Sequence, residues 1–401
     1  MSLIVLKFGG TSVGNCEKIV KVARLIKKYY DQKNKIIVVS SAMAGITNEL
    51  IQKSKKISNE FAKSEYDVLV STGEQMACSL LAGALIDLGL KSRSWLSWQL
   101  PITTEGNHAS SRIKKINTKE VLSFIKRGGI PVITGFQGIS IDKRVTTIGR
   151  GGSDASAIAI AKFFDADSCT IYTDVDGIYT TDPQVNLKAK KINKISYEEI
   201  LEMASLGAKI MQPSSVQDAM LNNVKIEVRS VFSKKSGTKI TNESDVINKN
   251  AITGIAYTKN DAKITIVGVA DKPGVASEIF KPLKEINLDM IVQTSSADKG
   301  DTDITFTIKR EDIKNVLNLL KNNKKISYKK IIQNDKVSKI SVVGAGMITQ
   351  SGVAQKFFNA LSKKKINIMV ISTSEIKISV LIDQKYTNEA VKVLHKEFDL
   401  D

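Results

Sequence analysis

The sequence contains few residues of the kinds that build disulfide frameworks, metal centres or hydrolase triads. Its three cysteines, Cys16, Cys78 and Cys169, are far apart and odd in number, which indicates reduced structural thiols rather than disulfides or a zinc site. Only two histidines occur, His108 and His395. Two histidines are too few for a histidine-rich metal site and make a Ser-His-Asp hydrolase site improbable.

Long apolar runs are also missing. No stretch approaches the roughly 18 uninterrupted apolar residues that a membrane helix needs. The first residues, MSLIVLK, lack the basic region and cleavage site of a signal peptide. We therefore expect a cytoplasmic protein with no membrane partner. Its 401 residues exceed what one hydrophobic core usually organises, which predicts two or three domains.

The formal net charge of +18 comes mostly from lysine. The lysines are dispersed in short groups, for example at 27–28, 55–56 and 363–365, without interleaved aromatic residues or a nucleic-acid-binding motif. This pattern favours solvated lysine faces over a nucleic-acid interface, so no nucleic-acid partner is expected. The positive electrostatic potential of these lysines would also favour binding of anionic substrates.

Strand and helix patterns alternate along the first part of the chain. Apolar runs predict buried strands and a 3.6-residue period predicts helices between them. The expected strands lie at 3–8, 35–40, 130–134 and 168–172, and the expected helices at 17–30 and 155–164. This alternation predicts an α/β domain with an open, mainly parallel sheet sandwiched by helices. A polar stretch at 236–245 marks its end.

The last part of the chain is an internal repeat. KITIVG at 263–268 recurs as KISVVG at 339–344, and GVA at 274–276 recurs at 352–354. Each copy reads as strand, glycine loop, helix and further strands, the order of a ferredoxin-like βαββαβ unit. We therefore predict a first domain at 1–235, a linker with one further strand at 236–262, and repeat domains at 263–335 and 336–401.

Two glycine turns follow predicted strands. KFGGTSVG at 7–14 can direct backbone N–H groups at an anion while Lys7 adds a cation, which suits a polyphosphate; the P-loop pattern GxxxxGK[ST] is absent. In TIGRGGSD at 147–154, Arg150 can grip a carboxylate and Ser153 offers a hydroxyl. Asp154 could cap the following helix or hold Lys7 in position, and the first role does not exclude the second. Open α/β sheets bind ligands at this end of their strands.

A third segment, YTDVDGIYTTDP at 172–183, closes a strand and places Asp174, Asp176 and Asp182 in a turn-rich loop. Turn chemistry alone explains many Asp-Gly and Asp-Pro pairs. Beside two anion loops, the same carboxylates indicate a nucleotide pocket near hydrated magnesium.

These segments, together with SSAMAGIT at 40–47, STGE at 71–74, GFQG at 135–138 and ASLGAK at 204–209, closely resemble the aspartokinase branch of the amino acid kinase family. The repeats resemble ACT domains, which sense small molecules. The resemblance implies phosphorylation of the L-aspartate side-chain carboxylate by ATP with Mg²⁺. That reaction is the first step of lysine, threonine, methionine and diaminopimelate biosynthesis.

The resemblance also implies roles for individual residues, with no protein ligand to a metal among them. Lys7 and Asp154 are the expected catalytic pair. ATP is expected at Lys7, Phe8, Gly9, Gly10, Thr173, Asp174, Tyr179, Asp182, Pro183 and Lys209. Aspartate is expected at Ser41, Thr47, Glu74, Arg150, Gly151, Gly152 and Ser153. Glu74 would meet the substrate ammonium and Arg150 its α-carboxylate.

In the ACT pair, the resemblance implies an amino-acid effector site. Its expected residues are Asp271, Pro273, Gly274, Val275, Ala276, Gln293, Asn367, Ile368, Ser374 and Glu375. Lysine, threonine or both are the candidate feedback inhibitors, and Glu375 could meet a lysine ε-ammonium. ACT domains commonly pair, so a homodimer or larger oligomer is expected.

Some positions depart from the family pattern, and other functions stay open. Gln184 stands where an Arg or Lys is usual, and Ser214 where an Arg is usual; the first ACT helix region is slightly short. The nearest alternative is a sister amino acid kinase that acts on another carboxylate substrate. A non-catalytic ACT regulatory protein is a further alternative, against which intact Lys7, Arg150 and Asp174 argue.

Overall fold

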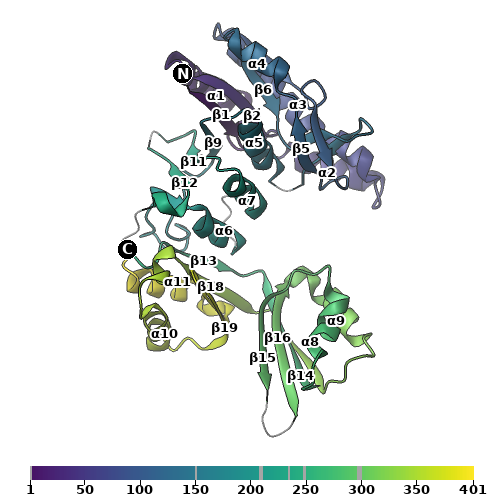
Figure 1. Ribbon diagram of the computed structural model, residues 1–401, viewed down its shortest axis with the longest axis vertical. Coiled ribbons are helices and arrows are strands. Elements are labelled where there is room, and N and C mark those ends of the chain that lie inside the picture. Colours follow the sequence, from purple (N-terminus) through teal and green to yellow (C-terminus); the bar gives the residue numbers. More distant parts are fainter. Residues whose placement is uncertain (1, 150, 207–210, 234, 247–249, 296–299) are drawn as a thin grey trace. The chain divides into compact units, whose positions relative to one another are not determined.

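The computed structural model describes residues 2–149, 151–206, 211–233, 235–246, 250–295 and 300–401 (Figure 1). The chain forms two compact units. The first comprises Met1–Ile178, Lys191–Ser205 and Lys209–Ile247, and the second comprises Tyr179–Lys190, Leu206–Ala208 and Asn248–Asp401. Arg150 and Lys209, which the sequence analysis assigns to the substrate and ATP, lie outside the described residues.

The first unit is built on an eight-stranded sheet with the order β10-β12-β11-β9-β1-β2-β6-β3. Its strands are β1 Leu3–Phe8, β2 Lys35–Ser40, β3 Ser92–Trp95, β6 Ile130–Thr134, β9 Ser168–Thr173, β10 Lys194–Ser196, β11 Ile226–Ser230 and β12 Thr238–Thr241. Every neighbouring pair is parallel except β11 and β12. The mainly parallel α/β sheet expected from the sequence is confirmed. The stretch 236–262 contributes β12 to this sheet.

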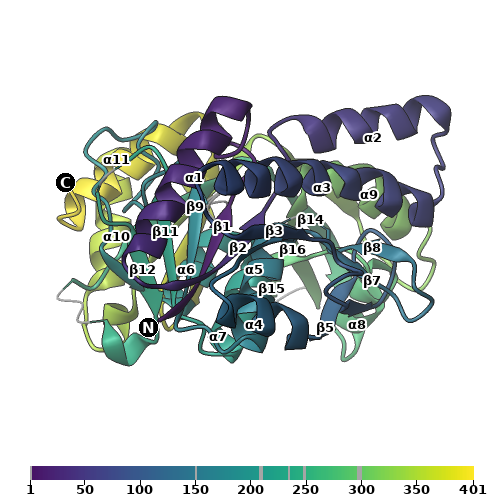
Figure 2. The same ribbon diagram turned by 90° about the horizontal axis from the view of Figure 1, so that it is seen from above.

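Helices cover both faces of the sheet, with α1 and α3 on one face and α4 and α5 on the other (Figure 2). The helices of this unit are α1 Cys16–Asp31, α2 Ile46–Ile57, α3 Lys63–Asp87, α4 Lys119–Lys126, α5 Gly152–Phe163, α6 Tyr197–Ser205 and α7 Pro213–Leu221. α1 buries one stripe, Ile19, Val22, Ala23 and Ile26, while Asn15 caps its start by accepting from Lys18 N. The apolar strands, buried on both faces, explain the apolar runs in the sequence.

A four-stranded sheet with the order β5-β4-β7-β8 extends the first unit; its strands are β4 Ile102–Glu105, β5 Arg112–Ile116, β7 Gln137–Ile139 and β8 Val145–Thr147. α3 is long and apolar enough to cross a membrane by length and composition, and it is the one such helix among the described residues. Half of its most apolar window is buried, and it holds the buried carboxylates Asp67 and Glu74. These features are those of a helix in a protein core.

The second unit contains two four-stranded antiparallel sheets, β15-β16-β14-β17 and β13-β18-β20-β19. The elements of the first are β14 Asp261–Ala270, α8 Val275–Phe280, β15 Asp289–Ser295, β16 Asp301–Lys309, α9 Ile313–Lys321 and β17 Lys330–Asn334. Those of the second are β13 Gly254–Thr258, β18 Val337–Val343, α10 Val353–Lys363, β19 Ile368–Ser374, β20 Lys377–Asp383 and α11 Thr387–Glu397.

The first module has the expected βαββαβ order, whereas the second ends on a helix. Its fourth strand is β13, which precedes the whole first module in the chain and pairs antiparallel with β18. The first module is therefore inserted into the second. The predicted βαββαβ order is therefore wrong for the second copy, in which α11 is the last element among the described residues.

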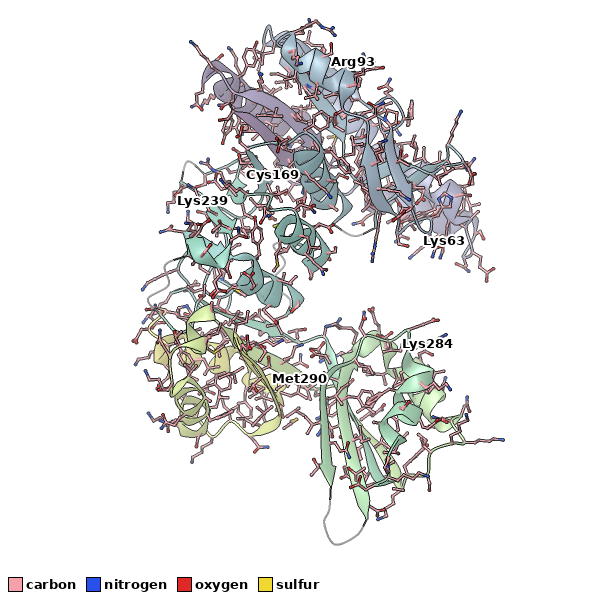
Figure 3. The ribbon with its side chains drawn as sticks, viewed as in Figure 1. Lys63, Arg93, Cys169, Lys239, Lys284 and Met290 are labelled. Atoms are coloured by element: carbon pink, nitrogen blue, oxygen red, sulfur yellow. The ribbon has the colours of Figure 1, made fainter. Side chains whose placement is uncertain are left out.

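The two modules pack against each other within this unit. Met290 and Val292 of β15 lie in one apolar cluster with Met369 and Val370 of β19 (Met290 is labelled in Figure 3). The side chain of Lys339 on β18 is only 5% exposed and forms ion pairs with Asp261 and Asp289 of the first module. An apolar and charged contact therefore joins the repeats, as the pairing of ACT domains predicts.

Candidate active site

The carboxyl ends of four adjacent strands, β9, β1, β2 and β6, form the floor of the candidate site. Lys7 on β1 is buried, and its Nζ lies 2.6 Å from Oδ1 of Asp154. Directly after β1, Gly9 N donates to Tyr172 O at 3.0 Å. A Cβ atom on Gly9 would lie 3.6 Å from Lys7 Nζ. The first glycine turn therefore lies beside the Lys7 ammonium, as expected for an anion site.

The second residue of this turn, Gly10, permits a close approach of two backbones. A Cβ atom at Gly10 would lie 2.8 Å from Ala42 O, in the loop after β2, and Ala44 N donates to Gly10 O at 3.1 Å. Any side chain at Gly10 would push the two loops apart. The SSAMAGIT segment, which contains Ser41 and the half-buried Thr47, is thus held against the KFGG turn.

The start of α5 supplies the other wall. Its N-cap is Gly151 with φ +70°, a left-handed conformation that favours glycine, and no side chain caps the helix. Asp154 lies in the first turn and pairs with Lys7, so the capping role of Asp154 is wrong. A Cβ atom on Gly135, after β6, would lie 3.0 Å from Ser153 Oγ, which places Ser153 on the same floor.

Glu74 of α3 points a buried carboxylate at the loop after β2. Its Oε1 accepts from Ala42 N at 3.1 Å. Its Oε2 is buried and has no hydrogen-bond partner among the described residues. Burial raises the pKa of Glu74 to about 7, although the Ala42 N–H acts in the opposite direction. A buried carboxylate oxygen without a partner fits a cationic group of a bound molecule.

A second buried carboxylate of α3, Asp67, was not identified from the sequence. It accepts from Thr147 Oγ1 and Ala109 N and contacts His108 Nδ1 at 2.6 Å. Thr147 ends β8 and begins the TIGRGGSD segment, so Asp67 anchors the base of that loop. Asp67 and Glu74 are seven residues apart, which puts both on one helix face. The sequence signal that could have identified Asp67 was this seven-residue spacing from Glu74.

The residues expected at the nucleotide divide between the two units. Thr173 ends β9, and its hydroxyl donates to the exposed Asp174 at 2.9 Å. Tyr179, Asp182 and Pro183 belong to the second unit. There Asp182 accepts from Tyr257 OH at 2.9 Å and Pro183 is exposed.

Among the described residues, no group of three or more His, Cys, Asp or Glu side chains is arranged to hold a metal ion. Mg²⁺ in phosphoryl-transfer sites is usually held by substrate phosphates, water and one or two carboxylates. Asp174 is an exposed carboxylate directly after β9 and fits such a limited contribution.

Most of the expected effector residues lie on loops and strands of the two ACT modules, while Val275 and Ala276 begin α8 and Val275 is buried. Asp271, Pro273 and Gly274 are exposed; Gly274 has φ +89° and is the N-cap of α8, followed by Val275 and Ala276. Gln293 is exposed on β15. Asn367 precedes Ile368 at the start of β19, and Ser374 and Glu375 are exposed at its end.

The cysteines are free, with Cys78 and Cys169 buried and Cys16 exposed (Cys169 is labelled in Figure 3). Burial raises the pKa of the Cys169 thiol to about 12. Cys169 is therefore an inert core thiol, as expected for a structural cysteine.

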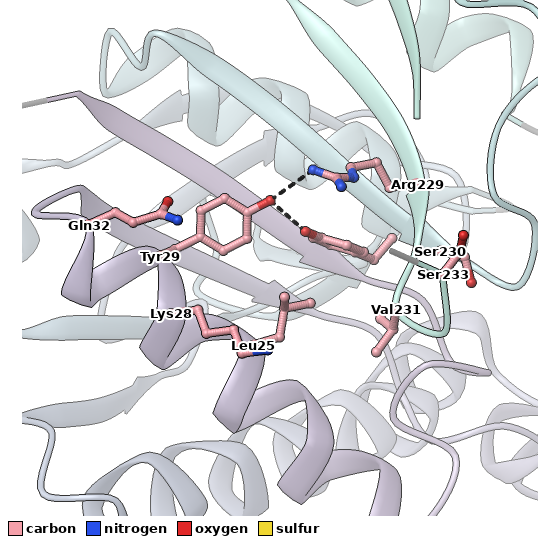
Figure 4. Close-up of a pocket in the computed structure, with 9 residues that line it drawn as sticks. Leu25, Lys28, Tyr29, Gln32, Arg229, Ser230, Val231 and Ser233 are labelled. Carbon is pink, nitrogen blue, oxygen red and sulfur yellow. Dashed lines mark hydrogen bonds between the residues drawn. The ribbon is translucent and has the colours of Figure 1, made fainter. Parts of the chain in front are cut away.

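A cavity of about 270 Å³ lies between α1, β9, β11 and the loop after β11 (Figure 4). Tyr29 OH lies 2.7 Å from Tyr172 OH, and Arg229 Nη1 donates to Tyr29 OH at 3.3 Å. No residue of the predicted catalytic, ATP or aspartate sets lines it. The hydrogen bonds of Tyr29 to Tyr172 and Arg229 join α1 to β9 and β11.

Comparison with known proteins agrees with the folds of the two units. The model of the amino acid kinase family matches residues 2–230, and the ACT domain model matches residues 264–323 and 340–398. An aspartate kinase of Stutzerimonas stutzeri is 46% identical, over 100% of this chain and 98% of the relative.

Two solved structures share the whole fold. E. coli aspartokinase III in complex with aspartate and ADP (R-state) is similar with a TM-score of 0.81 and 23% identity, covering 99% of this chain and 100% of that chain. E. coli aspartokinase III in complex with lysine and aspartate (T-state) is similar with a TM-score of 0.77 and 23% identity, covering 99% of this chain and 99% of that chain.

Proposed function

Because this chain belongs to the amino acid kinase family and is an aspartate kinase, we propose that the site on β1, β2, β6 and β9 transfers the γ-phosphoryl group of ATP to the side-chain carboxylate of L-aspartate. The carrying observation is Glu74, whose buried Oε2 has no partner among the described residues. An amino-acid ammonium group supplies the missing charge and hydrogen bonds. Arg150 takes the α-carboxylate, and Ser41, Thr47 and Ser153 complete the substrate contacts.

The nucleophile needs no general base. A substrate carboxyl group with a pKa of about 3.9 is already an anion at neutral pH. Catalysis then depends on alignment and on stabilising charge as the phosphoryl group moves. Lys7 provides a buried ammonium whose position is fixed by Asp154 at 2.6 Å. The Gly10 backbone N–H adds a donor, whereas the Gly9 N–H is already bonded to Tyr172 O.

We assign the nucleotide to the KFGG turn, Thr173, Asp174 and the segment with Tyr179, Asp182 and Pro183, with Lys209 as a further contact. The aspartate and ADP complex of E. coli aspartokinase III supports this kind of ligand. Mg²⁺ would neutralise phosphate charge, and Asp174 would contribute to holding its water shell. Lys7 remains the buried protein cation next to the glycine turn.

The tandem ACT modules carry feedback inhibition by lysine, threonine or both. The lysine complex of E. coli aspartokinase III supports lysine as an effector. In this chain, the loop from Asp271 to Ala276 would receive the effector carboxylate, and Glu375 the ε-ammonium of lysine. Inhibition requires the effector to bind the inactive state more tightly than the active state.

The proposal also covers the roles of the domains, the cellular compartment and the oligomeric state. Catalysis belongs to 1–235 and sensing to 263–335 and 336–401, joined by 236–262. The enzyme works in the cytoplasm as a homodimer or larger oligomer formed through ACT pairing, at the first step of lysine, threonine and methionine synthesis.

Hydroxylamine trapping tests the reaction. Mg·ATP and L-aspartate should give an aspartyl hydroxamate together with ADP, and added lysine or threonine should suppress both. A folded protein that forms hydroxamate from glutamate, and none from aspartate, would contradict the assignment of Glu74 and Arg150 to aspartate.

A further inference from the structure

The segment Tyr179–Lys190, called here the nucleotide segment, belongs to the same compact unit as the ACT modules. It contains three of the residues assigned to ATP, namely Tyr179, Asp182 and Pro183. We propose that the second ACT module positions this segment for nucleotide binding, with Tyr257 and His395 as positioning residues. This inference rests on the proposed function, because it takes the nucleotide contacts of the segment from it.

The nucleotide segment is closed at its base by two hydrogen bonds. Thr180 N donates to Lys190 O at 2.9 Å, and Lys190 N donates to Thr180 Oγ1 at 2.9 Å. The two ends of the loop are therefore held together, and Thr180 is their meeting point. Whatever holds Thr180 also sets the position of the loop.

The second ACT module contacts Thr180 twice. Ile255 N, on β13, donates to Thr180 O at 2.7 Å. His395 of α11 is fully buried, and its Nε2 lies 2.8 Å from Thr180 Oγ1. Because Lys190 N–H already donates to Oγ1, the hydroxyl proton is free to be donated to Nε2. The other ring nitrogen, Nδ1, then donates to Asp401 Oδ1 at 2.7 Å.

The far side of the loop is attached through the chain end and the module core. Lys188 Nζ donates to Asp401 Oδ2 at 2.8 Å, so Asp401 joins His395 and the loop. These two partners hold the pKa of Asp401 at about 2, so it is ionised at neutral pH. Val185 packs against the apolar core of the second ACT module.

Tyr257 acts directly on a residue assigned to ATP. Its hydroxyl on β13 donates to Asp182 Oδ2 at 2.9 Å, while Gln184 N donates to Oδ1 at 2.8 Å. Both oxygens of the carboxylate are thus occupied, and its plane is fixed. Because the Asp182 carboxylate is held by both hydrogen bonds, the Asp182–Pro183 turn is held in one conformation. A residue of the regulatory module thereby orients part of the nucleotide site.

Binding of Mg·ADP measured by calorimetry tests the inference on the full-length chain. Tyr257→Phe and Thr180→Val each remove one hydroxyl of this network with little change in shape. Loss of a hydrogen bond to a fixed partner predicts an increase of about three- to tenfold in the Kd for Mg·ADP and in the KM for ATP. The KM for aspartate should change by less than about twofold, because the aspartate contacts belong to the first unit.

Tyr386→Phe is the matched control. Tyr386 packs against the same module core, and within the described part of the chain its hydroxyl has no hydrogen-bond partner. It should leave the Kd for Mg·ADP unchanged. In an Asp182→Ala background, which leaves no side-chain acceptor at this position, Tyr257→Phe should cause no further loss, because Tyr257 acts through Asp182.

The outcomes separate the two proposals. Absence of hydroxamate with aspartate, in a protein that binds Mg·ADP, would refute the reaction and still allow the positioning role to be measured. Unchanged Mg·ADP affinity in both hydroxyl variants would overturn the positioning role. Equal losses for ATP and aspartate would also overturn it, because they would indicate a general loss of structure. A wild-type chain that fails to bind Mg·ADP would overturn both.

Discussion

Lys7 and Asp154 form a nearly buried ion pair that joins β1 to the first turn of α5, with Nζ and Oδ1 2.6 Å apart and side chains 9% and 13% exposed. Burying two charges has a large desolvation cost, which their attraction offsets only when the geometry of the pair is well fixed. The pair lies beside the Gly9 backbone, where an incoming anion would compete with Asp154 for the ammonium. The carboxylate thus keeps Lys7 oriented before the phosphate arrives.

Replacing Lys7 by methionine should lower kcat by about 10²-fold or more, because a preorganised cation is lost from the transition state. It should also lower the free energy of unfolding by about 3 kcal/mol, since Asp154 is left as an unpaired buried carboxylate. Hydroxamate formation and urea unfolding measure the two effects.

Two further variants separate these effects. K7M/D154N should recover stability relative to K7M while kcat stays low, because the orphaned charge is gone. Lys27→Met breaks an exposed pair with Asp31, with side chains 41% and 55% exposed, and should change neither quantity appreciably. Full turnover by K7M would contradict the catalytic role.

Asp67→Asn should destabilise the protein and weaken aspartate binding. The carboxylate accepts from Thr147 Oγ1 and Ala109 N at the base of the loop that continues to Ser153. Losing these charged hydrogen bonds predicts about 2 kcal/mol of lost stability. The KM for aspartate should rise several-fold while the KM for ATP changes little. Asp87→Asn, at the exposed end of the same helix, is the matched control; equal behaviour of the two variants would exclude an anchoring role.

The sheet could be predicted from the sequence because the apolar runs of its strands match their buried position in the fold. β1 at Leu3–Phe8 and β2 at Lys35–Ser40 each contain four consecutive apolar residues, at 3–6 and 36–39, the pattern expected of a buried parallel strand. The glycine turns were equally readable, since Gly9, Gly10 and Gly151 occupy places where a side chain would clash or the backbone is left-handed.

Contacts distant in sequence could not be read in the same way. β13 lies just before the first ACT module yet pairs with β18 of the second, and nothing local to Gly254–Thr258 specifies that partner. The contacts between His395, Asp401 and the nucleotide segment span more than two hundred residues. Strand pairing and side-chain networks of this kind are set by tertiary packing.

Glu375→Gln should weaken inhibition by lysine with the uninhibited rate unchanged. Glu375 is exposed after β19, where its carboxylate is available to a cationic side chain of an effector. Removing its charge predicts an increase of about tenfold in the lysine concentration for half inhibition. Glu311→Gln, at an exposed glutamate of the first module, is the control. Identical inhibition curves for E375Q and wild type would remove Glu375 from the effector site.

Glu74 predicts the pH dependence of aspartate use. Its pKa is raised by burial to about 7 in the free protein. Only the ionised carboxylate can pair with a substrate ammonium, so kcat/KM for aspartate should fall about tenfold per pH unit below 7 and level off above 8. Bound ammonium favours the ionised form, and the acid limb of kcat should therefore lie at lower pH than that of kcat/KM.

The raised pKa of Glu74 also makes the free energy of unfolding depend on pH. A carboxyl group whose pKa is higher in the folded than in the unfolded state binds more protons when folded. Its contribution to the free energy of unfolding therefore falls as pH rises from about 4.3, the unfolded value, to about 7, and is constant beyond. Glu74→Gln removes this ionisation: it should abolish the acid limb, raise the KM for aspartate and flatten the stability profile in that window. Calorimetry in buffers of different ionisation enthalpy should show proton release when aspartate binds the wild type near pH 7 and none with E74Q; an unchanged acid limb in E74Q would assign it to another group.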